Sequence, residues 1–156
     1  MKLDQLFSLA GKTLLTSIDD ASLSVIIQKT LIDAGAKLTE KSTADILILD
    51  TRNIAMMQTA SESMTKRGGS IIVIGKLNEI SAAIAGPLAV QLAAKNLRIN
   101  RLLLGPIEQP ALADKTCLRR AGTYDELQGP LLFLASEASS YMTGQSITVD
   151  GGQSVL

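Results

Sequence analysis

Residues Ser136 to Gly152 read S-E-A-S-S-Y-M-T-G-Q-S-I-T-V-D-G-G, and the apolar segment F-L-A comes directly before them. An apolar helix end, a turn at Thr143-Gly144 and a short alternating strand follow one another in this stretch. The pattern predicts a last helix over Asp125 to Ser136 and a last strand over Ser146 to Val149. The chain therefore ends with a helix that leads into a strand, as α/β proteins commonly do.

Further apolar runs earlier in the chain predict more strands of the same kind. These runs are Lys12 to Ser17, Asp45 to Asp50, Ser70 to Gly75 and Leu97 to Leu104. Nearly continuous apolar runs are typical of strands that are covered on both faces of a parallel sheet. Segments of helical character lie between them, at Ala21 to Ala34, Ala55 to Arg67 and Ile80 to Lys95. Gly35 is predicted to end the first of these helices, and the alternation indicates an open α/β sheet.

The F-L-A-S, T-G-Q and V-D-G-G segments resemble the C-terminal end of the short-chain dehydrogenase/reductase family. This resemblance implies a Rossmann-like, open and mainly parallel sheet of about five strands, with helices on both faces. The predicted strands match the family's first, fourth, fifth, sixth and seventh strands. Leu38 to Asp45 has room for at most a rudimentary second strand, so the family's second and third strand region is expected to be missing. Residues 1–156 are expected to form one truncated domain of this kind.

The family's phosphate-binding loop, T-G-x-x-x-G-x-G, has lost all of its glycines in this chain. The corresponding positions are Ser17, Ile18, Ser22 and Ser24. Asp19 and Asp20 also place negative charge where the phosphates of a dinucleotide would lie. We interpret Asp19, Asp20 and Ser22 as residues that cap the following helix and interact with its dipole. The family implies NAD or NADP, but these replacements predict no cofactor and assign no cofactor-binding residue.

The family's catalytic groups are replaced as well. Its Y-x-x-x-K pair, in which the lysine lowers the pKa of the acid–base tyrosine, falls on Leu77 and Ser81. No tyrosine lies between Lys2 and Thr123, so no other alignment restores the pair. The family's N-N-A-G segment corresponds to L-D-T-R at residues 49–52. We interpret Asp50 and Lys76, at the ends of two strands, as solvated turn residues, and no catalytic residue is assigned.

The loop after the Leu97 to Leu104 strand also resembles the family, but with altered contacts. Gly105 to Pro110 reads G-P-I-E-Q-P, where the family has P-G-x-x-x-T. Leu104 stands for the proline and Gln109 for the threonine, so the loop shape is expected to persist without its hydroxyl contact. We interpret Leu131 to Phe133 and Tyr141 as packing residues.

The composition excludes several classes of function. Fifteen basic and fifteen acidic residues cancel, and no basic face is present, which argues against binding to nucleic acid or anionic membranes. With one cysteine, Cys117, and no histidine, neither an internal disulfide nor a metal site is expected. Met1 to Asp4 has no basic head, and the apolar runs are too short to span a bilayer, so a soluble cytoplasmic protein is expected.

The sequence therefore predicts a family member that keeps the scaffold and has lost the chemistry, with a structural or regulatory role. In relatives, the helices that match Ala55 to Arg67 and Ile80 to Lys95 pair across a two-fold axis. A homo-oligomer, or a complex with a related dehydrogenase, is therefore expected. Two alternatives stay open: an NAD(P)-dependent oxidoreductase with an altered site, and a module that binds a small ligand in a crevice above Ile18, Asp50 and Gly75.

Overall fold

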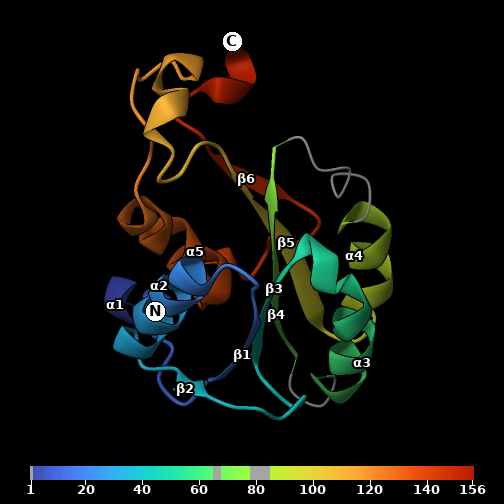
Figure 1. The fold of residues 1–156 in the computed structure, drawn as a ribbon. Helices are drawn as coiled ribbons and strands as arrows, with labels where there is room; N and C mark the ends of the chain where they lie inside the picture. Colours follow the sequence, from blue (N-terminus) through green and yellow to red (C-terminus); the bar gives the residue numbers. More distant parts are fainter. Residues whose placement is uncertain (1, 65–67, 78–84) are drawn as a thin grey trace.

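The computed structural model describes residues 2–64, 68–77 and 85–156, which form a parallel sheet of six strands (Figure 1). The strand order across the sheet is β2-β1-β3-β4-β5-β6, and every neighbouring pair is parallel. The strands are β1 (Thr13–Ser17), β2 (Lys37–Leu38), β3 (Ile46–Asp50), β4 (Gly69–Lys76), β5 (Leu97–Leu104) and β6 (Ser146–Val149). The prediction of an open parallel sheet is confirmed. About five strands were expected, and the additional strand is β2, which has only two residues. It overlaps at Leu38 the segment in which at most a rudimentary second strand was expected.

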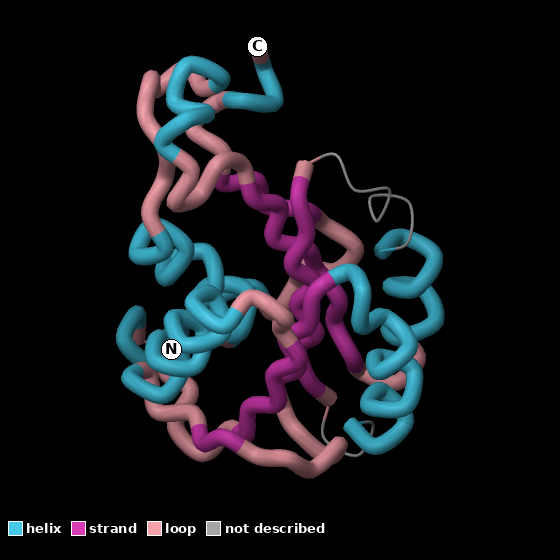
Figure 2. The backbone as a smooth tube through the Cα atoms, viewed as in Figure 1, coloured by secondary structure: helices cyan, strands magenta, loops and turns pink. Residues whose placement is uncertain are grey.

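Helices cover both faces of the sheet, as the sequence predicted (Figures 1 and 2). Helices α1 (Leu3–Phe7), α2 (Ala21–Asp33) and α5 (Gln128–Ala135) lie on one face, and α3 (Ile54–Met64) and α4 (Ala85–Ala93) lie on the other. The short 3-10 helices are η1 (Thr51–Asn53), η3 (Pro110–Lys115), η4 (Tyr124–Leu127), η5 (Glu137–Ser139) and η6 (Gln153–Val155). The predicted helix ends at 65–67 and 80–84 lie outside the described residues. Helix α1 was not predicted, because five residues are too few for a periodic pattern.

Strand β3 shows why the apolar runs predicted buried strands. Ile46 and Ile48 pack in the core on the α2 and α5 face, while Leu47 and Leu49 pack in the core on the α3 and α4 face. None of these four side chains is more than 1% exposed. Successive side chains of a strand point to opposite faces, so a strand between two helical layers must be apolar at every position.

Helix α2 begins and ends at residues that the sequence identified. The Asp20 carboxylate accepts a hydrogen bond from the Leu23 backbone N–H at 3.0 Å, which caps the N-terminus of the helix. Gly35 has a φ angle of +104° directly after the last turn, so it ends the helix in the left-handed region. Leu23, Ile27 and Leu31 form the buried stripe between these ends.

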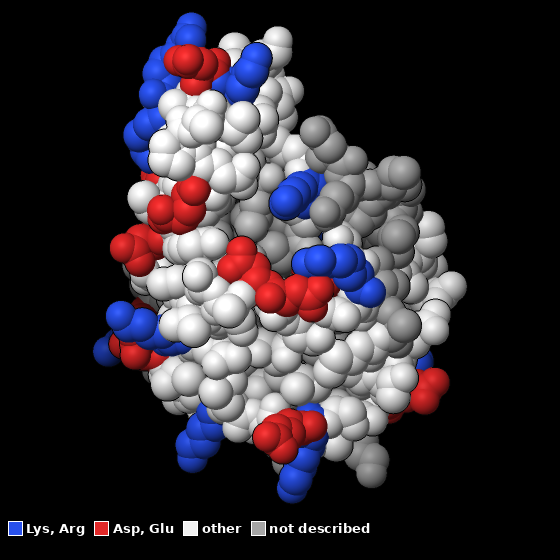
Figure 3. All heavy atoms as spheres, viewed as in Figure 1, with Lys and Arg blue, Asp and Glu red and all other residues white. Residues whose placement is uncertain are grey.

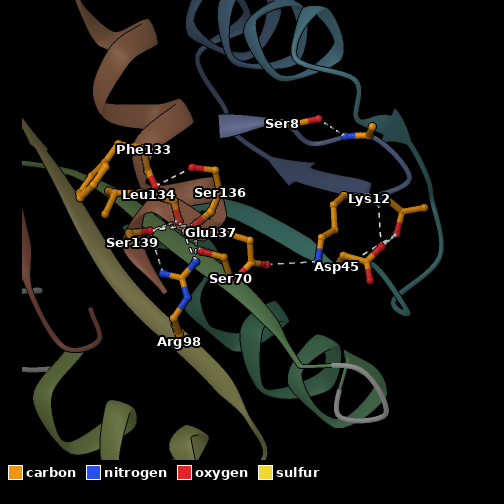
Figure 4. A network of polar contacts seen from close by, with 12 residues as sticks. Ser8, Lys12, Asp45, Ser70, Arg98, Phe133, Leu134, Ser136, Glu137 and Ser139 are labelled. Carbon is orange, nitrogen blue, oxygen red and sulfur yellow. Dashed lines mark hydrogen bonds and ion pairs between the residues drawn. The ribbon is translucent and has the colours of Figure 1, made fainter. Parts of the chain in front are cut away.

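A half-buried arginine on β5, Arg98, holds the end of α5 and the following turn against the sheet (Figure 4). The Arg98 guanidinium donates to the carbonyls of Leu134 and Ser136 at 3.3 and 3.2 Å, and to the Ser139 hydroxyl at 3.0 Å. It also lies 3.4 Å from the Met142 carbonyl. The last carbonyls of a helix have no partner within the helix, so a cation at this position satisfies them and favours the helix dipole. Burial lowers the pKa of Arg98, and the nearby Glu137 opposes that shift.

The V-D-G-G ending closes the last strand through its backbone. The Asp150 carboxylate accepts from the N–H groups of Gly152 and Ser154 at 2.9 and 2.7 Å. Gly105 lies so close to this turn that an added Cβ would stand 2.5 Å from the Asp150 Cα. The G-P loop and the V-D-G-G ending are therefore packed backbone to backbone.

One packing prediction is wrong. Leu131 is fully buried, and Leu132 and Phe133 pack against the same core, but Tyr141 is fully exposed at 104%. The turn that contains Tyr141 is fixed by the Met142 carbonyl, which accepts from the Asn100 side-chain amide at 2.9 Å. Because the backbone holds this turn in place, the tyrosine ring is left free to point into solvent.

Replacing Arg98 with methionine is expected to destabilise the fold by about 2–3 kcal/mol, since charged hydrogen bonds to several oxygens would be lost. Urea unfolding followed by circular dichroism measures this loss. Arg120→Met is the matched control, because the Arg120 side chain is 53% exposed and pairs with Glu126 at the surface. A loss for Arg98→Met no larger than that of the control would contradict the role given to Arg98.

Candidate functional site

A crevice opens at the carboxyl ends of β1, β3, β4 and β5, where open α/β sheets bind ligands. Its volume is about 190 Å³. The lining residues are Ile18, Asp20, Leu23, Asp50, Thr51, Arg52, Ile74, Gly75, Lys76, Leu104, Gly105, Ile107 and Gln109. The expected juxtaposition of Ile18, Asp50 and Gly75 is confirmed. Figure 3 shows acidic and basic side chains meeting at a hollow in the middle of this face.

Asp50 is the centre of a polar cluster on one side of the crevice. Its carboxylate accepts from the backbone N–H groups of Asp19 at 3.1 Å and Arg52 at 3.0 Å. The Arg52 guanidinium lies 3.6 Å from the same carboxylate and 3.1 Å from that of Asp19. Asn53 completes the cluster by donating to the Ser17 carbonyl at 3.2 Å. With these partners, Asp50 ties the end of β3 to the loop after β1, and its side chain is only 13% exposed. Its interpretation as a solvated turn residue is therefore wrong.

Tyr124 is a crevice neighbour that the sequence analysis did not single out. Its hydroxyl donates to the Asp20 carboxylate at 3.2 Å, although the two residues are 104 positions apart. Burial, the charge of Asp20 and then that of Glu108 raise the pKa of Tyr124. The phenol therefore stays protonated at neutral pH and acts as a hydrogen-bond donor to Asp20. No motif marks this contact, because it depends on how η4 packs against α2.

The other residues named in the sequence analysis lie at different distances from the crevice. Lys76, the exposed last residue of β4, lines the crevice, and so does Gln109. Leu77 lies in the turn after β4, where it borders a neighbouring hollow together with Leu112. Ser81 lies outside the described residues. Cys117 is exposed, and its thiol lies 3.3 Å from the Gly152 carbonyl.

The N-terminus of α2 does not fit a pyrophosphate in the manner of a glycine-rich loop. The Leu23 N–H is already bonded to the Asp20 carboxylate, and the Asp19 N–H is bonded to that of Asp50. Two carboxylates thus take the donors that an anionic group would need, and they repel it. The crevice thus presents the carboxylates of Asp20 and Asp50 on the side where α2 begins and β3 ends.

Across residues 2–64, 68–77 and 85–156, no three Cys, Asp or Glu side chains are grouped to hold a metal ion. None of the helices described is long and apolar enough to cross a bilayer.

The sequence and the fold are both similar to those of known dehydrogenases. A family model described as enoyl-(acyl carrier protein) reductase matches residues 82–154. The protein is 32% identical over 145 residues to dehydrogenase/reductase SDR family member 4 of Oryctolagus cuniculus, a match covering 74% of this chain and 56% of that protein. The chain thus spans about half the length of that relative.

Solved structures share the fold along the whole chain. A short-chain type dehydrogenase/reductase from Mycobacterium marinum has a TM-score of 0.88 and 22% identity, and the match covers 100% of both chains. A gluconate 5-dehydrogenase from Burkholderia cenocepacia J2315, in complex with NADP and tartrate, has a TM-score of 0.82 at 18% identity. That match covers 99% of this chain and 100% of the other.

These comparisons correct the expectation that no cofactor is involved. Proteins with this fold include one solved with NADP bound, so the loss of the glycine motif did not justify that prediction. The physical reason is that a Rossmann-like crevice contacts a dinucleotide along several strand ends, of which the glycine-rich loop is only one.

Proposed function

Because the chain belongs to the short-chain dehydrogenase/reductase family, we propose that it is a catalytically degenerate member with a structural or regulatory role. It acts as one subunit of an oligomer, formed either with copies of itself or with a related dehydrogenase. In that assembly, this chain supplies scaffold and surface.

The position of the tyrosines carries this proposal. The chain has two, Tyr124 and Tyr141. Tyr141 is fully exposed, and the Tyr124 hydroxyl is directed to the Asp20 carboxylate. The family's acid–base chemistry needs a tyrosine whose pKa is lowered by a neighbouring lysine, whereas the pKa of Tyr124 is raised. Neither tyrosine therefore suits the transfer of a proton to a substrate oxygen.

The outer surface of α4 supports the proposed assembly. Residues 85–94 carry no charged side chain, and Val90 on this helix is 77% exposed. Ala89 packs toward the sheet, whereas Gly86, Ala93 and Ala94 are exposed and leave room for another helix to approach closely. An uncharged, exposed helix face of this kind is typical of a surface that a partner covers.

The alternative is an NAD(P)-dependent oxidoreductase with an altered site. Its support is the fold shared with the B. cenocepacia protein solved with NADP, together with a crevice at the carboxyl ends of the strands that includes Lys76. In that case the cofactor would supply the hydride, and the apolar floor of Ile18, Ile74 and Leu104 would exclude water beside it.

A turnover assay distinguishes the catalytically degenerate protein from the NAD(P)-dependent oxidoreductase. The protein is mixed with NADPH or NADH and a panel of ketones, aldehydes and sugar lactones, and nicotinamide absorbance is followed beside an active family member. We expect rates at least about a hundredfold below those of the active enzyme, because general acid catalysis contributes about 10²–10⁴. Turnover that depends on Lys76, and is lost in Lys76→Ala, would favour the oxidoreductase and overturn the proposal.

Removing one charge at the crevice is expected to strengthen dinucleotide binding. Asparagine caps helices as well as aspartate does, so Asp20→Asn keeps the cap and removes the repulsion. We expect NADP affinity, measured by calorimetry, to rise about fivefold, since one charge near a phosphate is worth about 1 kcal/mol in a well-solvated site. The matched control is Asp33→Asn, which makes the same change at the exposed far end of α2. Equal effects of the two variants would show that the charge at Asp20 does not limit binding.

A further inference from the structure

Arg101 is a buried cation with few hydrogen-bond acceptors among the described residues. It lies within β5, paired in register with Val73 of β4 and Ser146 of β6, and only 9% of its surface is exposed. One terminal nitrogen donates to the Ser146 hydroxyl. The other two guanidinium nitrogens, Nε and Nη1, are buried and have no hydrogen-bond partner among the residues that the structure describes.

Arg98, three residues earlier on the same strand, has the hydrogen-bond acceptors that Arg101 lacks. It points to the opposite face of the sheet, where four oxygen atoms accept from it. A guanidinium stays charged at any physiological pH, so Arg101 cannot escape its desolvation by losing a proton. An uncompensated buried charge is among the most costly features a fold can hold. An acceptor from outside the described residues is therefore expected at Arg101.

The surroundings of Arg101 offer further donors to such an acceptor. Ser146 and Thr148 are exposed on β6, and they share the face of Arg101 because Ile147 and Val149 pack into the core on the other side. The Ser146 oxygen accepts from Arg101, so its own O–H proton remains available to donate. Asp150, next on this face, is already directed to the backbone N–H groups of Gly152 and Ser154. Ser146 and Thr148 thus present hydroxyl donors to solvent at the edge of the sheet beside the buried Arg101.

We propose that Arg101, Ser146 and Thr148 form a binding site for an oxyanion with at least two acceptor oxygens, of the carboxylate or phosphate class. The site lies on the α4 face of the β5–β6 edge and is separate from the crevice. The oxyanion is either a free small ion or a carboxylate of a second copy of this chain. Both sources use the same chemistry, and they differ in how stability responds to added anion and to protein concentration.

The first arm of the test measures the thermal midpoint, Tm, of the full chain in chloride buffer as inorganic phosphate or acetate replaces chloride at constant ionic strength. For a free ion, the Tm rises with saturation, by about 5 °C at a hundredfold excess over the dissociation constant. Arg101→Met loses the saturable rise and keeps only the general effect of the salt. Lys95→Met, which removes one exposed positive charge, keeps the wild-type response.

The second arm repeats the measurement over a range of protein concentrations without added anion, with the mass of the assembly measured in parallel. For a carboxylate of a second copy, the Tm and the mass rise together with concentration, and Arg101→Met abolishes both changes. Arg101→Lys keeps the positive charge and is expected to retain part of the response to anion or to protein concentration. It is the control that separates loss of the site in Arg101→Met from poor folding of that variant. A wild-type Tm that is insensitive both to anions and to protein concentration overturns the proposal.

Discussion

The contact between the Arg98 guanidinium and the end of α5 is the interaction on which the rest of the fold depends. It joins β5 to the Leu134 and Ser136 carbonyls, and Ser70 of β4 donates to the same Leu134 carbonyl at 2.8 Å. Asn100, next on the same face, holds the Met142 carbonyl and the Gln145 N–H, which sets where β6 begins. The side chains of Ser70, Arg98 and Asn100 thus form one polar seam, which fixes the last helix, the last turn and the last strand. Because these groups are largely buried, each must keep its hydrogen-bond partner.

This seam and the crevice lie at opposite ends of the sheet. Arg98 is near the start of β5 and Leu104 is its last residue, so strand geometry separates them by about 20 Å. Side chains at the carboxyl ends can therefore change with little effect on the contacts that hold the fold. The polar cluster of Asp19, Asp50 and Arg52 is stable in its own right, because backbone N–H groups and a guanidinium satisfy the carboxylates. One chain can therefore keep the contacts that hold the fold while the side chains that line its crevice differ from those of the family.

Local sequence patterns predicted the parts of this structure that depend on local rules. The apolar run of β3, the Asp20 cap and the Gly35 stop each reflect a fixed periodicity or backbone requirement, and each is confirmed. The crevice residues Ile18, Asp50 and Gly75 could be predicted because parallel strands end at one edge. The Tyr124–Asp20 contact, the exposure of Tyr141 and the unsatisfied Arg101 could not, since they depend on packing between distant segments. The cofactor prediction failed because a missing motif was taken to exclude a ligand that contacts several loops.

The proposed role of this chain is to contribute scaffold and surface to an assembly. The most direct test is native mass spectrometry of the protein purified from the cell that makes it, without crosslinking, over a range of concentrations. The account predicts a complex of two or more chains, either copies of this protein or this protein with a related dehydrogenase. A monodisperse single chain at micromolar concentration, with no related dehydrogenase purified alongside it, would contradict the account.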